Sequence, residues 1–242
     1  MMNDQQGHAK LMPPRPRAVV HRDRLQRLLR EASDAGVVWM SAPAGYGKTT
    51  LAADFANRFH GPCLWYRLDP GDEDPTCLFR LLRQAAERAG GAPGVALPEF
   101  STAVLPNASA LSPQFFGPLG ACLGGDGLVV LDDYQELPSD APLHALVAAG
   151  LEVLPEGLLV LVISRTSPPP DFVRLRCASR LAQVTRRDLR LTKDEASQII
   201  DLRFHDVDPA LAGRLHEQSE GWAAGLVLLC EQMRDGTCRV TP

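Results

Sequence analysis

The segment Ala42-Pro43-Ala44-Gly45-Tyr46-Gly47-Lys48-Thr49 decides the fold. It matches the phosphate-binding loop pattern, except that Ala42 stands where the strictest form has glycine. The apolar run 37–40 before it predicts a strand, and residues 49–56 after it predict a helix. This strand–loop–helix context favours a nucleotide site over a glycine-rich turn with a solvated lysine.

The chemistry of this loop is local. Gly45 and Gly47 allow the backbone to curl, so that consecutive N–H groups point at phosphate oxygens. The N-terminus of the following helix adds partial positive charge. Lys48 would reach the β- and γ-phosphates, and the Thr49 hydroxyl would bind Mg²⁺. The candidate binding residues therefore extend from Ala42 to Thr50.

A second, acidic motif completes the candidate site. Asp132 and Asp133 follow the aliphatic run 128–131, which predicts a strand whose carboxyl end faces the ligand crevice of an open α/β sheet. Asp132 would orient Mg²⁺ and its waters. Asp133 would position or deprotonate the attacking water. Alone, the pair is as easily an acidic turn after a buried strand, but beside a phosphate loop the functional interpretation is favoured.

Arg165 lies at the end of the next predicted strand, 158–163, at the same edge of the sheet. There its guanidinium could contact the γ-phosphate and report its presence, because its donors match phosphate oxygens. The alternative is a surface arginine in the turn before Pro168.

Two aromatic residues also bear on the site. Tyr46 is expected to be exposed near the nucleotide, and Trp222 either packs in a helix or forms a wall near the base.

Short apolar runs alternate with helical patterns up to residue 190. Strands are expected at 37–40, 63–68, 128–131, 158–163 and 181–184. Runs buried on both faces and separated by helices predict an α/β fold, a P-loop NTPase with a parallel β-sheet flanked by helices. From Leu191 onward only helical patterns occur. The expected division is a flexible N-terminal tail over 1–17, a nucleotide-binding domain over 18–190 and a small helical subdomain, truncated, over 191–242.

Composition and charge restrict the possible partners and cellular compartment of the protein. The 242 residues carry a net charge of −4, so the chain as a whole is not an evident nucleic-acid binder. No apolar run approaches the roughly 20 residues needed to span a bilayer, and the N-terminus is polar and proline-rich, unlike a signal peptide. None of the six cysteines is in a CxxC pair, and buried, reduced thiols are expected. We therefore expect a cytoplasmic protein without a membrane partner.

Taken in order along the chain, these motifs resemble a known family. Residues 41–51, around the phosphate loop, are nearly a signature of the MalT-like, large LuxR-type transcriptional regulators, which belong to the STAND class of signal-transducing ATPases. Further similar segments occur in the family order, at 14–25, 65–69, 131–134, 163–165 running on to 174–176, and 220–226. The resemblance covers essentially everything from about residue 10 onward.

The resemblance implies a switch driven by adenine nucleotides. In this family an ADP-bound resting form is held closed, and inducer together with ATP opens it and drives self-association on promoter DNA. The implied roles of the loop lysine and threonine, the two aspartates and Arg165 agree with those given above. The resemblance further implies that Arg22 lies near the nucleotide and that Val20 touches adenine.

The sequence also departs from the family. Gln135 stands where the family often has histidine after the Asp-Asp-Tyr motif. The winged-helix, helical-repeat sensor and DNA-binding helix-turn-helix parts of such regulators do not fit within 242 residues. The expectation is an excised domain or a naturally short relative, which would meet DNA only through a helix-turn-helix absent from this chain.

Two other classes of protein are alternatives. One is a turnover P-loop ATPase or phosphotransferase not involved in transcription, for whose arginine-rich lid only the arginines of 174–190 are candidates. The other is an interaction module with a degenerate site. Intact Gly47, Lys48 and Thr49, together with the two aspartates, argue against degeneracy because these are the groups that phosphate chemistry needs.

Overall fold

Five parallel strands form the central sheet of the computed structural model, which describes residues 9–15, 19–90, 95–99, 108–124, 126–203 and 208–234. The strands are β1 (Val37–Ser41), β2 (Cys63–Arg67), β3 (Leu128–Asp132), β4 (Leu159–Ser164) and β5 (Leu181–Thr185). Their order in the sheet is β2-β3-β4-β1-β5, and all neighbours are parallel. The five strands and the parallel sheet predicted from the sequence are confirmed.

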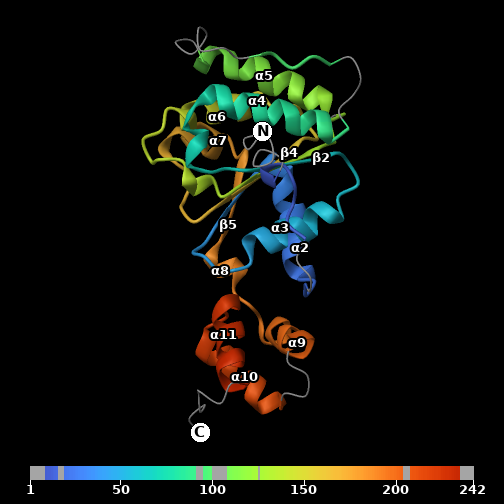
Figure 1. Cartoon of the computed structure of the whole chain (residues 1–242), viewed down its shortest axis with the longest axis vertical. Coiled ribbons are helices and arrows are strands. Elements are labelled where there is room, and N and C mark those ends of the chain that lie inside the picture. Colours follow the sequence, from blue (N-terminus) through green and yellow to red (C-terminus); the bar gives the residue numbers. More distant parts are fainter. Residues whose placement is uncertain are drawn as a thin grey trace.

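Helices cover both faces of the sheet (Figure 1). One face is covered by α2 (Asp23–Ala32), α3 (Lys48–Asn57) and α8 (Arg186–Leu189). The other is covered by α4 (Pro75–Arg88), α5 (Ala108–Cys122), α6 (Leu143–Leu151) and α7 (Val173–Cys177). Successive side chains of a strand point to opposite faces, so Val37 and Trp39 enter one core while Val38 and Met40 enter the other. Short 3₁₀ segments are η1 (Ser33–Ala35), η2 (Pro70–Glu73), η4 (Tyr134–Glu136) and η5 (Pro170–Phe172).

A separate helical subdomain follows α8, at the end of the molecule away from α4 and α5 (Figure 1). It consists of α9 (Lys193–Arg203), α10 (Pro209–Ser219) and α11 (Ala223–Arg234), which share a small core of their own. The start of α9 is a capping box: the Glu195 amide donates to Thr192 Oγ1 at 3.2 Å, and the Thr192 amide donates to Glu195 Oε2 at 3.0 Å. Asp208 caps α10 by accepting from the Ala210 amide.

Of the tail expected over 1–17, the structure describes residues 9–15, and these contact the folded domain. Within the described residues 9–15, Leu11 is buried in the core of the sheet face that α4 covers. The ammonium group of Lys10 lies 2.7 Å from Asp69 and 3.0 Å from Asp72, in the acidic turn after β2. An apolar contact and an ionic contact therefore anchor residues 9–15. The prolines in and beside this stretch had indicated that it is irregular.

Two further expectations concern the state of the cysteines and the presence of membrane-spanning helices. The five cysteines within the described ranges form no disulfide. Cys122 and Cys230 are buried as expected, whereas Cys63 and Cys77 are half-buried and Cys177 is exposed. Cys238 lies outside the described residues. Among the helices that the structure describes, none is long and apolar enough to cross a membrane.

Candidate nucleotide site

The phosphate loop connects the end of β1 to the start of α3, as expected. Gly45 and Gly47 have φ angles of +82° and +77°, a conformation that costs side-chain-bearing residues energy. Gly47 is also the residue before the first turn of α3, where its carbonyl accepts from the Leu51 amide at 2.8 Å. The two glycines therefore allow the curled backbone that the sequence predicted.

Lys48 closes the loop on itself. Its ammonium group donates to the carbonyls of Ala42 at 2.6 Å and Pro43 at 3.0 Å, and the residue is 8% exposed. Burial, followed by repulsion from the Arg165 guanidinium, lowers the pKa of Lys48 below its usual value. A desolvated cation of this kind is stabilised by any anion that enters the loop.

Thr49 and Asp132 meet at the point where a cation would sit. The Thr49 hydroxyl donates to Asp132 Oδ1 at 3.0 Å, and Asp132 is almost fully buried. Burial, followed by repulsion from Asp133, raises the pKa of Asp132. One hydroxyl and one carboxylate suit Mg²⁺, which takes few protein ligands and completes its shell with water and phosphate oxygens. The described residues contain no cluster of three or more histidine, cysteine, aspartate or glutamate side chains that could hold a metal ion.

Asp133 follows directly in a left-handed conformation, with φ of +54°. Its Oδ2 accepts from Arg67 Nε at 2.8 Å, and its Oδ1 accepts from Gln135 Nε2 at 2.9 Å. The carbonyl oxygen of the Gln135 side chain in turn accepts from the Arg165 amide at 3.0 Å. The position that departs from the family pattern thus links the ends of β3 and β4.

Arg165 reaches this edge because of the strand order. β4 lies between β1 and β3, so its end separates the phosphate loop from the two aspartates. Arg165 lines a cavity of about 390 Å³ together with Arg67 and Asp133. The structure therefore brings Lys48, the aspartates and Arg165 to one edge of the sheet.

A second cavity, of about 450 Å³, lies between the phosphate loop and the helical subdomain. Its volume is in the range of small-molecule sites. Its lining is largely apolar and comprises Val19, Val20, Gly45, Tyr46, Gly47, Thr50, Leu51, Leu191, Ile199, Leu202, Ala223, Ala224, Val227 and Leu228, with Arg22, Asp54 and Arg203 as the charged members. Val20, which the family resemblance implies as an adenine contact, is among the residues that line this cavity.

Arg22 lines the same cavity but is engaged elsewhere. Its Nη2 donates to the carbonyls of Leu189 and Arg190 and to Glu195 Oε2, at 2.9–3.0 Å. Arg22 thereby joins the segment before α2 to the linker that precedes α9. The structure gives it an anchoring contact that the sequence did not indicate.

The expectation for Tyr46 was wrong. Its side chain is 5% exposed and packs in the core beside α2 and α3. The Arg186 guanidinium lies 5.6 Å from the centre of its ring, a cation–π contact from the first turn of α8. Its ring therefore supports the loop from the side of the core, although the residue still lines the apolar cavity.

Sequence reasoning missed the contact between the loop and α11. The Ala224 amide donates to the Gly45 carbonyl at 2.9 Å, and the Trp222 indole donates to the Ala44 carbonyl. A Cβ placed on Gly45 would lie 2.6 Å from both Ala224 Cβ and Trp222 Nε1. The available signal was the Gly221-Trp222 pair before an apolar helix, which does not by itself indicate its partner.

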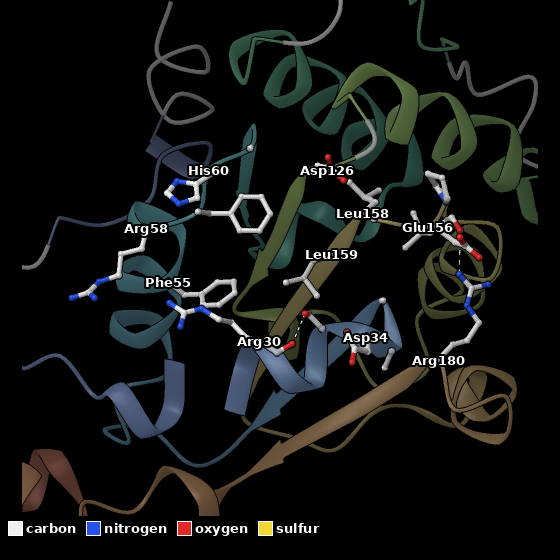
Figure 2. Close-up of a pocket in the computed structure, with 18 of the residues that line it drawn as sticks. Arg30, Asp34, Phe55, Arg58, His60, Asp126, Glu156, Leu158, Leu159 and Arg180 are labelled. Carbon is white, nitrogen blue, oxygen red and sulfur yellow. Dashed lines mark hydrogen bonds between the residues drawn. The ribbon is translucent and has the colours of Figure 1, made fainter. Parts of the chain in front are cut away.

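A larger cavity lies elsewhere. It measures about 1150 Å³ and opens at the other end of the strands, where Gly36 precedes β1. Figure 2 shows Phe55 and Leu159 in its middle, Arg58 and His60 on one side, and Glu156 and Arg180 on the other. No residue of the phosphate loop lines it, so size alone does not identify the nucleotide site.

Comparison with known proteins adds two findings, and no family model matches the chain. The chain is 32% identical over 224 residues to the HTH-type transcriptional regulator MalT of Serratia proteamaculans, covering 92% of the chain and 24% of that protein. It is 30% identical over 234 residues to MalT of Vibrio cholerae, with 91% and 24% covered. The chain thus spans about a quarter of the length of these relatives, and the resemblance to MalT-like regulators is confirmed.

A solved structure shows the fold. A STAND protein with a tetratricopeptide repeat sensor from Pyrococcus horikoshii aligns with a TM-score of 0.55 at 18% identity, covering 90% of the chain and 31% of that protein. The α/β P-loop fold expected from the sequence is therefore confirmed.

Proposed function

We propose that this chain is the ATP/ADP-binding switch module of a signal-responsive transcriptional activator in the cytoplasm. It hydrolyses ATP slowly with Mg²⁺ and self-associates in the ATP-bound state. DNA is bound only through a helix-turn-helix outside these 242 residues. The sequence likeness to MalT regulators supports the regulatory class, and the geometry of the site supports the nucleotide.

One observation carries the proposal: the first turn of α11 is hydrogen-bonded to the backbone of the phosphate loop at Ala44 and Gly45. A nucleotide that fills the loop acts on the same backbone. A ligand shifts a conformational equilibrium by binding one state more tightly. The position of the helical subdomain can therefore differ between the ADP and ATP states.

Each side chain has a role in this proposal. Lys48 neutralises the β- and γ-phosphates, and Thr49 with Asp132 holds Mg²⁺. Asp133 orients or deprotonates the attacking water. Arg165 contacts the γ-phosphate and distinguishes ATP from ADP. The adenosine occupies the apolar cavity beside Val20, whose size and lining suit a base.

The alternative is a phosphotransferase or motor ATPase with rapid turnover. A phosphotransferase lid needs arginines that are available to a substrate. Here Arg180 donates to backbone carbonyls of Glu152 and Leu154, and Arg190 pairs with Glu220 at 3.1 Å. Arg186 stacks on Tyr46. These three arginines are engaged within the fold, which favours the switch, whereas Arg174, Arg176 and Arg187 are exposed.

The first test identifies the nucleotide that co-purifies with the chain, by acid denaturation and ion-exchange chromatography. Near-stoichiometric ADP is expected, because slow dissociation of ADP would keep the switch in its resting state. The Lys48→Ala variant is the control and should carry none. An empty site with rapid steady-state ATP turnover would instead favour the enzyme alternative.

Self-association needs its own measurement. Sedimentation velocity of the Asp133→Asn variant, which should bind ATP without hydrolysing it, is compared with ATP–Mg²⁺ and with ADP. A larger species with ATP alone is expected. Identical sedimentation in both nucleotides would remove self-association of this chain from the proposal.

A further inference from the structure

The carboxylate of Asp133 is held on both of its oxygens. Arg67 Nε donates to Oδ2 at 2.8 Å, and Gln135 Nε2 donates to Oδ1 at 2.9 Å. Neither donor belongs to the phosphate loop. The group that would act on water is thus engaged by two side chains of the protein itself.

Arg67 reaches Asp133 because of the sheet register. It is the last residue of β2 and lies opposite Asp132 on β3. Its side chain is 64% exposed and lines the 390 Å³ cavity with Asp133 and Arg165. An exposed arginine at this place can leave its partner without disturbing the core.

A guanidinium on a carboxylate opposes general-base action in two ways. It offsets the negative charge that would attract the proton of water, and it occupies the oxygen that would accept that proton. We propose that Arg67 is a restraining residue, which withholds Asp133 from the attacking water and keeps ATP hydrolysis slow. This inference rests on the proposed role of Asp133.

In the restrained step, Asp133 acts as a general base. The Asp133 carboxylate takes a proton from water while the water oxygen forms a bond to the γ-phosphorus. The bond from that phosphorus to the β–γ bridging oxygen breaks, and its electron pair stays on ADP. The step proceeds only during the fraction of time in which the Arg67–Asp133 pair is open.

Gln135 keeps the carboxylate aligned when Arg67 leaves. It holds Oδ1 with its amide nitrogen while its amide oxygen accepts from the Arg165 amide at 3.0 Å. Asp133 therefore stays fixed to the end of β4 after one of its two donors has gone. Removing Arg67 should free a lone pair without releasing the side chain.

The direction in which the hydrolysis rate changes when Arg67 is removed distinguishes this role from direct phosphate binding. If Arg67 contacted the γ-phosphate, its removal would weaken ATP binding and slow hydrolysis. If it restrains Asp133, its removal speeds hydrolysis and leaves ATP affinity unchanged. An exposed ion pair is weak, so the rise should be only about two- to fivefold.

The experiment is single-turnover hydrolysis of ATP–Mg²⁺ with protein in excess, with ATP affinity measured in parallel by equilibrium binding. Arg67→Gln should be about two- to fivefold faster than wild type, and Arg67→Lys, which keeps the charge, should be closer to wild type. Arg174→Gln is the matched control, because Arg174 is 82% exposed and lies 3.9 Å from Glu152. It should behave as wild type.

Asp133→Asn, alone and combined with Arg67→Gln, completes the design. Loss of hydrolysis in both supports a gain that acts through Asp133. If Asp133→Asn is inactive but Arg67→Gln is no faster than wild type, only the restraining role is overturned. If Asp133→Asn hydrolyses ATP at the wild-type rate, the proposed role of Asp133 fails and the restraint fails with it.

Discussion

The indole nitrogen of Trp222 donates a hydrogen bond to the backbone carbonyl of Ala44, 3.0 Å away, across 178 residues of sequence. The Ala224 amide makes a parallel bond to the Gly45 carbonyl at 2.9 Å. The start of α11 therefore rests on the phosphate loop itself. Because the loop backbone would also face phosphate, we propose that this contact couples the helical subdomain to the nucleotide site.

Trp222→Phe tests this coupling by removing the donor while keeping a ring. A net hydrogen bond contributes about 0.5–1.5 kcal/mol, so ADP should dissociate roughly two- to tenfold faster. Stopped-flow release of a fluorescent ADP analogue measures the rate. Glu231→Gln, an exposed change on the same helix, is the control. Equal release from Trp222→Phe and wild type would contradict a coupling through this bond.

Gly45→Ala probes the same contact from the loop side. The new Cβ would lie 2.6 Å from Trp222 Nε1 and from Ala224 Cβ, so α11 must move. Gly36→Ala is a close control, because Gly36 has a φ of +80° against +82° for Gly45 but meets no atom within 4 Å. Both should lose about 1–2 kcal/mol of stability from the left-handed conformation.

Only Gly45→Ala should also lose ADP affinity, by about tenfold or more, the equivalent of about 1.4 kcal/mol. Isothermal titration calorimetry measures the affinity, and urea unfolding measures the stability. Similar ADP affinities in the two variants would show that α11 does not bear on nucleotide binding.

The parts of the fold that the sequence predicted correctly have local signals. The strand β1 shows a short apolar run, and the loop after it has its glycines at fixed spacing. Asp132 could be assigned beside the loop because the carboxyl ends of parallel strands share one edge of the sheet. These inferences need no knowledge of which distant segments touch.

The contacts that the sequence could not predict join distant segments. Arg22 reaches Glu195, 173 residues away, and Arg67 reaches Asp133 from a neighbouring strand. Tyr46 was expected to be exposed, yet Arg186 and the core beside α3 enclose it. Such pairings depend on strand order and on the placement of the subdomain, which residue patterns do not specify.

Lys48→Met should abolish ADP binding without weakening the nucleotide-free protein. Burial lowers the pKa of Lys48, so its charged form is disfavoured in the folded state. That cost is full below the lowered pKa and disappears as the pH rises toward 10.5, the unfolded value. The neutral variant should therefore be at least as stable at pH 7.

Thermal unfolding with and without ADP measures both effects. Lys48→Met should match or exceed the wild-type melting temperature without ADP and should show no rise when ADP is added. Lys193→Met, at a lysine that is 72% exposed, should keep the rise. A lower melting temperature for Lys48→Met alone would mean that its two carbonyl contacts outweigh the cost of burying its charge.

The Arg22–Glu195 pair should hold the linker between the two parts of the chain in a pH-dependent way. Both side chains are 9% exposed, and their charged atoms lie 2.9 Å apart. Burial alone would raise the pKa of Glu195, but hydrogen bonds from Arg22 and the Thr192 amide outweigh it, so the pKa falls below 4.5. Its stabilising contribution is thus present above pH 4.5 and lost as the pH drops through the lowered value.

Glu195→Gln should cost about 2–4 kcal/mol at pH 7, because it leaves a buried guanidinium with backbone carbonyls as its remaining partners. The difference from wild type should shrink as the pH falls through the lowered pKa of Glu195, where Glu195 itself becomes protonated. Urea unfolding at pH 7 and at an acidic pH below the lowered pKa of Glu195 measures both values. Glu217→Gln, in a surface pair 3.8 Å from Lys193, should cost under about 0.5 kcal/mol at either pH. A Glu195→Gln deficit of equal size at both pH values would mean that shape and capping, rather than charge, hold α9 to the segment before α2.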